Sequence, residues 1–285
     1  MADSDKTIKH FVFVRFFPYK LPKYKYDIFD PEFLSAQLRL VKRNLFRTLE
    51  NQTNKNFELV FVMNFKFFDD PKYEFIFSGL KEATTLPLTF IKNDILEAES
   101  EAVVSAEMTR LIEDALDKYD FVIQSRLDFD DFIFKNAVED TQNKVKECAG
   151  FLAYGYCKGY VYVRGELYPF DRAYEGRGGG HFSAMQSLIM ESSFAKKLPF
   201  TEIYDFGHTV FRRRLKEFLE ENGEKFSESM FQQNTKDLAY IYFRHKSAVS
   251  GKNKQGTASS IFDAEATKKY FEEEFGFRQK LISIK

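Results

Sequence analysis

The chain has 285 residues, with 42 Lys and Arg against 43 Asp and Glu, so its formal net charge is −1. A balance this even excludes the global positive field with which proteins attract nucleic acid or an acidic membrane surface. Apolar residues make up 44% of the chain, which is enough for a sizeable core.

No stretch approaches the roughly 20 consecutive apolar residues that a membrane-spanning helix needs. The opening MADSDKTIKH is polar and lacks the apolar segment of a signal peptide. The two cysteines, Cys148 and Cys157, are too few for a disulfide framework and too far apart for a CxxC motif. We therefore expect a soluble cytoplasmic protein, and the sequence leaves peripheral membrane contact open.

Strands and helices are predicted to alternate in the first half of the chain. Asp30-Pro31 provides an N-cap and a first-turn proline, and the apolar residues that follow recur at helical spacing up to Leu49. The predicted strands are 10–17, 57–63, 86–91 and 120–127, and the helices between them are 31–49, 75–83 and 100–118. This alternation predicts a parallel sheet covered by helices.

The second half has a different pattern. Its predicted elements are an aromatic hairpin over 150–170, a glycine-rich loop at 175–181 that leads into an apolar segment, a helix over 209–223, a strand over 237–245 and an acidic helix over 263–275. We expect one α/β domain over 1–250, with a donor half (1–135) and an acceptor half (136–250). A flexible loop and a C-terminal helix would follow over 251–285.

The stretch FVIQSRLDFDDFIF, residues 121–134, ends a predicted buried strand in three carboxylates: Asp128, Asp130 and Asp131. Parallel α/β sheets place their ligand sites at the carboxyl ends of strands. Like charges held this close raise one another's pKa, and a hard divalent cation is the usual compensation. The pattern favours a metal and diphosphate site, although a bare acidic turn that caps the next helix has the same letters.

RLDFDD resembles the Arg-Leu-Asp-x-Asp-Asp signature of a family of bacterial GT-A-type glycosyltransferases, the rhamnosyltransferase family. The segment 39–64 resembles that family's helix, Gln-Thr turn and second strand, and FVRFF with Arg15 resembles its first strand. The resemblance covers the first half well and the second half loosely. It implies a GT-A fold, a Rossmann-like nucleotide-diphospho-sugar transferase architecture with a C-terminal helical extension.

The resemblance also implies roles at the acidic motif. Asp130 would bind Mn²⁺ or Mg²⁺ together with the donor diphosphate, and Asp131 would be a second ligand or would orient the loop. Asp128 would face the ribose or the sugar of the donor, and Arg15 would belong to the same donor site. Arg126 would hold the diphosphate or fix Asp128 by a charge-assisted hydrogen bond, and a merely compensating ion pair is an equal alternative.

The late segment YIYFRH is followed by a basic stretch. By the same resemblance His245 would be a metal ligand, and Arg244 and Lys246 would pair with the diphosphate of the donor. An ordinary surface loop with solvated charges is the competing interpretation.

An inverting sugar transfer needs a general base, which related enzymes place after the hairpin and before a helix with arginines. Asp205 and His208 occupy that place, with Glu202 and Glu191 as weaker candidates. Asp205 is also a strong candidate for a simple helix N-cap. The RRR run at 212–214 is most simply a solvated helix face.

The resulting expectation is a metal-dependent glycosyltransferase that moves a sugar, rhamnose being one candidate, from a dTDP or UDP donor to a glycan or glycolipid hydroxyl. Two alternatives are a haloacid-dehalogenase-like phosphatase and a non-catalytic binding module with the same fold. Nucleic acid is not an expected partner, and homo-oligomerisation is left open.

Overall fold

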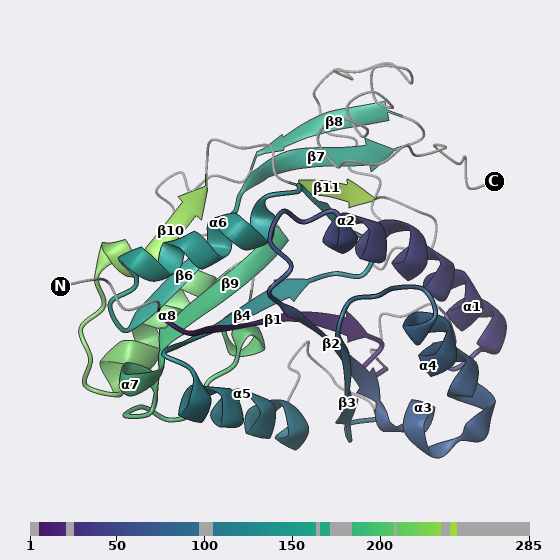
Figure 1. Cartoon of the computed structure of the whole chain (residues 1–285), viewed down its shortest axis with the longest axis horizontal. Coiled ribbons are helices and arrows are strands. Elements are labelled where there is room, and N and C mark those ends of the chain that lie inside the picture. The colour runs from purple at the N-terminus through teal and green to yellow at the C-terminus, as the bar shows by residue number, and fades with distance from the viewer. Residues whose placement is uncertain are drawn as a thin grey trace.

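A mostly parallel seven-stranded sheet forms the centre of the protein (Figure 1). The computed structural model describes residues 6–20, 26–96, 105–163, 166–171, 184–207, 210–234 and 240–243. The strands of this sheet, in spatial order, are β10 (Phe231–Asn234), β6 (Phe151–Tyr156), β9 (Ala184–Glu191), β4 (Phe121–Leu127), β1 (Ile8–Phe16), β2 (Glu58–Asn64) and β3 (Leu88–Asn93).

Helices cover both faces of the sheet. They are α1 (Pro31–Leu40), α2 (Phe46–Glu50), α3 (Phe65–Asp69), α4 (Glu74–Lys81), α5 (Ala106–Lys118), α6 (Ala137–Asn143), α7 (Ser192–Ala195) and α8 (Phe211–Glu221). A π-helical turn, Val41–Leu45, joins α1 to α2. Short 3-10 turns occur at Pro71–Tyr73, Lys144–Glu147, Ile203–Phe206 and Glu228–Met230. The predicted α/β class with a mostly parallel sheet is confirmed.

The order of the strands creates a switch point in the middle of the sheet. The chain runs outward from β1 through β2 to β3, and it then returns to place β4 on the other side of β1. Both β2 and β4 are parallel to β1, so the connections leaving β1 and β4 diverge at their carboxyl ends. In open α/β sheets this divergence is where ligands bind.

Alternation along the strands divides the core into two layers. Val12, Val14 and Phe16 of β1 pack with α1, α2, α4 and α6 on one face. Phe11 and Phe13 pack with α5, α7 and α8 on the other face. Figure 1 shows α2 and α6 on one side of the sheet and α5 on the other. Successive side chains of a strand point to opposite faces, so a polar residue can be assigned to a layer from its position alone.

A buried chain of polar groups crosses the first of these layers. The Gln142 amide donates to the Asn56 carbonyl at 2.8 Å and lies 3.3 Å from Nδ1 of His10. With Nδ1 accepting, Nε2 of His10 donates to Ser125 Oγ at 2.7 Å, and the hydroxyls of Ser125 and Ser187 lie 2.7 Å apart. Burial lowers the pKa of His10 to about 3, so the imidazole is neutral in the folded protein.

The second half of the chain contributes antiparallel strands. β9 lies between β4 and β6 and is antiparallel to both. The hairpin predicted over 150–170 consists only of β7 (Lys158–Val163) and β8 (Glu166–Asp171), while β6 leaves it to join the large sheet. The apolar segment predicted after the glycine-rich loop is strand β9, which lies between β4 and β6 in the large sheet.

A second, four-stranded sheet has the order β5 (Phe132–Ile133), β11 (Tyr240–Phe243), β7 and β8. It brings the segment after the acidic motif beside the late strand, because β5 pairs with β11. Gly159 of β7 allows the close approach of β11 on that side, since a Cβ at that position would lie 2.5 Å from the carbonyl oxygen of Tyr240. The predicted helix over 263–275 and the proposed domain limits beyond residue 243 lie outside the described residues.

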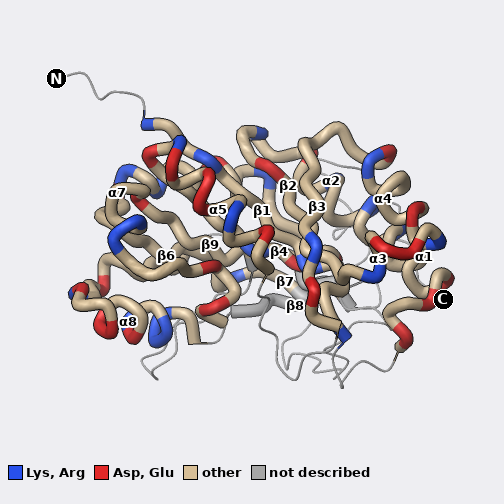
Figure 2. Tube along the Cα trace, turned by 90° about the horizontal axis from the view of Figure 1, so that it is seen from below, with Lys and Arg blue, Asp and Glu red and all other residues tan. Residues whose placement is uncertain are grey.

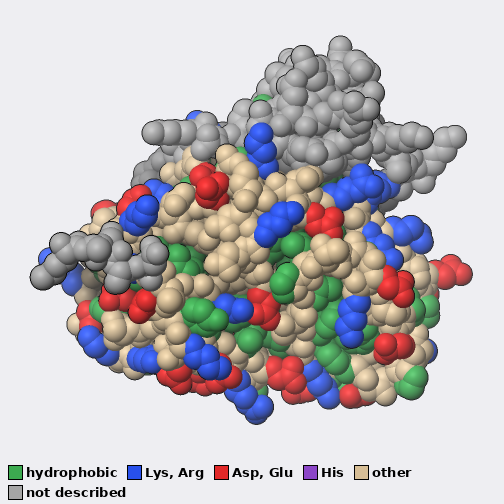
Figure 3. Space-filling view, in the orientation of Figure 1, with side chains coloured by type: hydrophobic (Ala, Val, Ile, Leu, Met, Phe, Trp, Pro, Cys, Tyr) green, Lys and Arg blue, Asp and Glu red, His purple; other side chains and the backbone are tan. Residues whose placement is uncertain are grey.

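Charges of both signs are mixed over the described surface. Figure 2 shows acidic and basic residues on both α5 and α8, and Figure 3 shows charges of both signs interspersed with apolar side chains on one face. This distribution agrees with the near-zero net charge. Within the described ranges, no helix is both long and apolar enough to cross a membrane.

Candidate functional site

The acidic motif lies at the switch point of the large sheet. β4 ends at Leu127, and Asp128 to Asp131 form a turn in which the Asp131 amide donates to the Asp128 carbonyl at 3.2 Å. Asp131 is buried, with 3% of its surface exposed, whereas Asp128 and Asp130 are partly exposed. The predicted placement of the three carboxylates at the carboxyl end of a buried strand is confirmed by this geometry.

Arg15 and Asp128 meet across neighbouring strands. In the β1–β4 pair Val14 lies opposite Leu127, so the next residues along the two strands are Arg15 and Asp128. Their side chains form an ion pair with an Nη2–Oδ1 distance of 3.6 Å. The sequence suggested Arg126 as a partner for Asp128, and the strand register shows that the distant Arg15 reaches that carboxylate.

A buried tyrosine lies against both arginines of the motif. The guanidinium carbons of Arg15 and Arg126 lie 5.3 and 5.2 Å from the centre of the Tyr204 ring. Arg15, Arg126 and Asp128 all belong to the sheet face that carries α5 and α8, which is the face on which Tyr204 packs. Burial raises the pKa of Tyr204 although the two guanidinium groups oppose this, so the phenol is neutral and serves as a π surface for two cations.

The segment that carries Tyr204 is fixed to β4 by one buried amide. Gln124 donates to the Thr201 carbonyl at 3.3 Å and accepts from the Ile203 amide at 3.0 Å. Gln124 precedes Arg126 by two residues and therefore shares its sheet face. Sequence reasoning missed both Gln124 and Tyr204. A glutamine in the middle of a predicted buried strand was the available signal, because a buried amide needs partners.

Asp205 is part of a capping box in this segment. Its Oδ2 accepts from the Glu202 amide at 2.8 Å and from the Thr201 hydroxyl at 3.2 Å. The N-cap of this turn is Glu202 and Asp205 is its N3 residue, so the N-cap role considered for Asp205 from the sequence is wrong, although its carboxylate does accept a capping hydrogen bond. The catalytic role of Asp205 stays a prediction. His208 lies outside the described residues.

Glu202 is the carboxyl group with the most unusual environment in this region. It is 4% exposed, and no hydrogen-bond partner reaches its Oε1 within the part of the chain that is described. Burial, with a smaller contribution from Asp205, raises the pKa of Glu202 to about 8. Glu202 is therefore mostly protonated at neutral pH, a property that marks candidate acid–base groups when they lie beside other functional residues.

The fit of a divalent metal can be judged from the ligands that are present. Asp130 and Asp131 offer hard carboxylate oxygens in one turn, and Mg²⁺ is usually held by one or two carboxylates together with substrate phosphates. No group of three or more His, Cys, Asp and Glu suited to a metal occurs among the described residues. The proposed ligand His245 and the proposed donor contacts Arg244 and Lys246 lie outside them. The two carboxylates fit a metal that relies on substrate phosphates for the rest of its shell.

Two asparagines at the ends of β2 and β3 were also missed by sequence reasoning. Asn64 and Asn93 are buried and both donate to the Pro18 carbonyl, at 3.0 and 2.9 Å. They hold the segment that leaves β1 against the carboxyl ends of the neighbouring strands. They therefore shape the edge on which Arg15 lies.

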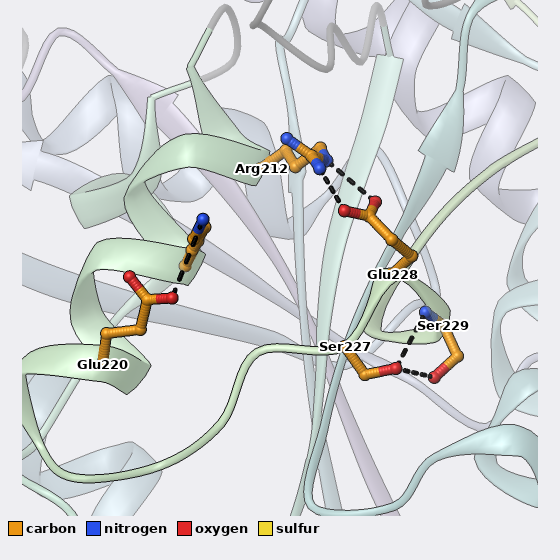
Figure 4. A network of polar contacts seen from close by, with 6 residues as sticks. Arg212, Glu220, Ser227, Glu228 and Ser229 are labelled. Carbon is orange, nitrogen blue, oxygen red and sulfur yellow. Dashed lines mark hydrogen bonds and ion pairs between the residues drawn. The ribbon is translucent and has the colours of Figure 1, made fainter.

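The arginine run at 212–214 is a helix face, as predicted. Arg213 and Arg214 form loose ion pairs with Glu217, at 3.6 and 3.5 Å. Arg212 differs, because its guanidinium binds both carboxylate oxygens of Glu228 and so joins α8 to the segment before β10 (Figure 4).

Comparison with known proteins finds no matching family model and no matching curated protein. Among solved structures, the chain is similar to S. aureus TarS residues 1–349, with 15% identity, a TM-score of 0.35 and coverage of 82% of this chain but only 60% of that one. HddC from Yersinia pseudotuberculosis gives 14% identity, a TM-score of 0.36 and coverage of 82% and 93%. A structure described as a nucleotide-diphospho-sugar transferase from Desulfovibrio desulfuricans G20 gives 11% identity and a TM-score of 0.39, with coverage of 92% of this chain and 94% of that one. Similarity at this level identifies no substrate, so the function has to be argued from the site itself.

Proposed function

We propose that the protein is a metal-dependent GT-A-type glycosyltransferase that transfers a sugar from a nucleotide-diphosphate donor to a hydroxyl group. The observation that carries this proposal is the convergence of the acidic turn at Asp128–Asp131 with Arg15 and Arg126 at the switch point of the sheet. Cations beside carboxylates suit a diphosphate that arrives with a divalent metal. Rhamnose is one candidate sugar, with dTDP or UDP as the carrier and a glycan or glycolipid as the acceptor.

In this proposal each side chain at the carboxyl ends of β1 and β4 has one role. Asp130 and Asp131 hold the metal, which when bound offsets the charge that develops on the departing nucleotide. Arg15 and Arg126 contribute positive charge beside the diphosphate, and Asp128 orients the ribose or sugar while paired with Arg15. Tyr204 keeps both guanidinium groups in place, so that they need little reorganisation when the donor binds.

The acceptor hydroxyl must lose a proton to a base during an inverting transfer. Asp205 and His208 are the proposed candidates, and the structure adds a reason to consider Glu202. A group with a pKa of about 8 is a competent base only in its ionised fraction. If Glu202 is the base, kcat/KM should rise with pH up to about 8 and this dependence should be lost in Glu202→Gln.

The test of the proposal is the melting temperature of the protein against a panel of nucleotides and nucleotide sugars, with and without Mn²⁺. A ligand that binds only the folded state raises Tm, by mass action. We expect a Mn²⁺-dependent rise with one donor class, and loss of that rise in Asp130→Asn. Asp114→Asn, which changes an exposed carboxylate on α5, is the matched control and should respond as wild type does.

A well-folded protein that responds to no member of the panel would contradict the proposal, and wild-type donor binding by Asp130→Asn would remove Asp130 from the site. The phosphatase alternative predicts hydrolysis of a generic phosphomonoester instead. It is less favoured, because its acidic motif normally follows the first strand of its domain, whereas here three strands of the sheet precede β4. The non-catalytic alternative predicts neither donor binding nor hydrolysis.

A further inference from the structure

Three buried polar side chains form a stripe along the helical segment between β1 and β2 and just past its C-terminal end. They are Asn44, Thr48 and Gln52, which are spaced by four residues and are at most 2% exposed. Residues four apart lie on the same side of a helix, and Gln52, just past the C-cap Asn51, donates back to the Thr48 carbonyl at 3.0 Å. Buried polar groups are costly unless each finds a partner, so this stripe has to be explained by what it contacts.

The stripe binds the backbone of the acidic turn and of the segment that follows it. The Asn44 side-chain amide donates to the Asp130 carbonyl at 3.3 Å. The Thr48 hydroxyl donates to the Ile133 carbonyl and accepts from the Ile133 amide, the latter at 3.0 Å. Gln52 donates to the Phe134 carbonyl at 2.9 Å and accepts from the Val138 amide at 3.0 Å.

Asn44 lies in the π-helical turn between α1 and α2. In this turn the Phe46 amide donates to the Val41 carbonyl, five residues earlier, where an α-helix would use a spacing of four. Such turns are rare and occur often at functional sites, because they change the direction in which side chains leave the helix. The irregularity therefore coincides with the one residue of the stripe that reaches the acidic motif itself.

We propose that Asn44 is a positioning residue for the acidic turn, whose contact with the Asp130 peptide fixes the direction of the Asp130 carboxylate for its ligand. The proposal rests on the function proposed above, in that the ligand is a metal with a diphosphate. Thr48 and Gln52 anchor the segment after the turn and complete its attachment to the helix. A ligating carboxylate held this way loses less freedom when it binds a cation, which is the general effect of groups that orient ligands.

The environment of Asn44 separates this role from a contribution to overall stability. Its Oδ1 is buried and has no hydrogen-bond partner among the described residues. Asn44→Leu, of similar size, removes that unsatisfied oxygen along with the contact to Asp130. The change should therefore alter the turn more than the free energy of unfolding, since replacing an unsatisfied polar group by an apolar one offsets the lost hydrogen bond.

The experiment compares wild type, Asn44→Leu and Gln52→Leu by three measurements. These are Tm without ligand, Mn²⁺ binding in the presence of UDP or dTDP, followed by the EPR signal of the free ion against a protein-free control, and hydrogen exchange over residues 128–134. Gln52→Leu is the matched control, because it removes an amide from the same stripe whose contacts lie at Phe134 and Val138. A positioning role predicts Mn²⁺ binding weakened roughly tenfold in Asn44→Leu, at the lower end of the usual range for orienting residues.

Hydrogen exchange at the Asp131 amide should also become faster in Asn44→Leu, because that amide closes the turn. Gln52→Leu should lower Tm more and leave Mn²⁺ affinity within about twofold of wild type, below the effect expected of an orienting group. Wild-type Mn²⁺ affinity and exchange in Asn44→Leu would overturn the proposal and leave the proposed function intact. Absence of Mn²⁺ binding in the wild-type protein would instead overturn the metal-dependent function, and the proposed purpose of Asn44 with it.

Discussion

The two halves of the described chain are built on different principles. From β1 to β4 every neighbouring pair within the large sheet is parallel, and helices connect the strands. From β6 onward the chain inserts the antiparallel strand β9 into the same sheet and contributes β7, β8 and β11 to the small sheet. The first half supplies the acidic turn and both arginines, and the second supplies Tyr204 and Glu202. The candidate site exists only where the two halves meet.

The two halves also differ in their buried titratable groups. The first half holds His10 and the second holds Glu202, and the stability that each contributes changes with pH in opposite directions. Burial lowers the pKa of His10 in β1 to about 3. As the pH falls below 6.5, the imidazole therefore binds a proton in the unfolded chain but stays neutral in the folded chain. The stability that depends on neutral His10 is therefore complete above pH 6.5 and is lost as pH falls toward 3.

The first prediction is that His10→Gln changes the pH dependence of unfolding on the acid side. Relative to wild type, its free energy of unfolding should rise by about 1.4 kcal/mol per pH unit as pH falls below the ordinary histidine pKa, several kcal/mol in all. Denaturant unfolding of both proteins between pH 4 and 8 measures this difference. Parallel curves for the two proteins would show that His10 does not titrate as its burial implies.

The second prediction concerns Glu202 and has the opposite sign. The pKa of Glu202 is raised from 4.5 to about 8, so the folded state keeps a proton that the unfolded chain releases. Stability linked to Glu202 is complete below pH 4.5 and is lost as pH rises through 8. Glu202→Gln should gain relative stability by about 1.4 kcal/mol per pH unit over that window.

The same unfolding measurements test the second prediction if they are extended to pH 9. Asp205→Asn helps to separate the causes, because the Asp205 charge is the smaller of the two contributions to the raised pKa. It should reduce the effect without removing it. A Glu202→Gln curve that runs parallel to the wild-type curve would contradict burial as the main cause.

The third prediction breaks the connection between the halves. Gln124→Leu removes the two hydrogen bonds that attach Thr201 and Ile203 to β4 and leaves both backbone groups without these partners. Each unsatisfied group costs about 1–3 kcal/mol, so we expect a loss of about 3 kcal/mol in the free energy of unfolding. The control is Gln232→Leu, at an amide whose contact with Glu147 is exposed and should matter little. Equal losses in the two variants would contradict an anchoring role for Gln124.

The fourth prediction separates the ring of Tyr204 from its hydroxyl. No partner reaches the buried hydroxyl among the described residues, so Tyr204→Phe should change stability by less than about 0.5 kcal/mol. Tyr204→Leu loses the π surface under Arg15 and Arg126 and should cost about 1–2 kcal/mol. Chemical denaturation distinguishes the two, and a large loss in Tyr204→Phe would indicate a hydrogen bond to the phenol.

The smallest expected effect is at the surface ion pair between α8 and the segment before β10. Glu228 is largely exposed, so Arg212→Ala should cost less than about 1 kcal/mol and should matter less at high salt. Arg213→Ala, whose ion pair is longer and more exposed, should cost less still. A larger loss in Arg213→Ala would show that the bidentate contact in Figure 4 is not what joins the two segments.

The first half could be predicted from the sequence because its signals are local. The helix start at Asp30-Pro31 is confirmed, with the Asp30 carboxylate accepting from the Glu32 amide. Each predicted strand from 10–17 to 120–127 overlaps a strand of the sheet, with ends displaced by at most two residues. The second half was harder, because an aromatic alternating stretch does not reveal which sheet each strand joins. The separation of β6 from the β7–β8 hairpin is of this kind.

The sequence by itself determined that buried strands carry their polar residues to one edge, since the apolar runs and the acidic motif are both local patterns. Only the tertiary structure decided that Arg15 pairs with Asp128, that Tyr204 lies against two arginines and that Asn44 contacts the Asp130 peptide. These partners are separated by 78 positions (Arg126 and Tyr204) to 189 positions (Arg15 and Tyr204) along the chain. Strand register and helix packing bring such residues together, and neither can be predicted from the local sequence on one side of the contact.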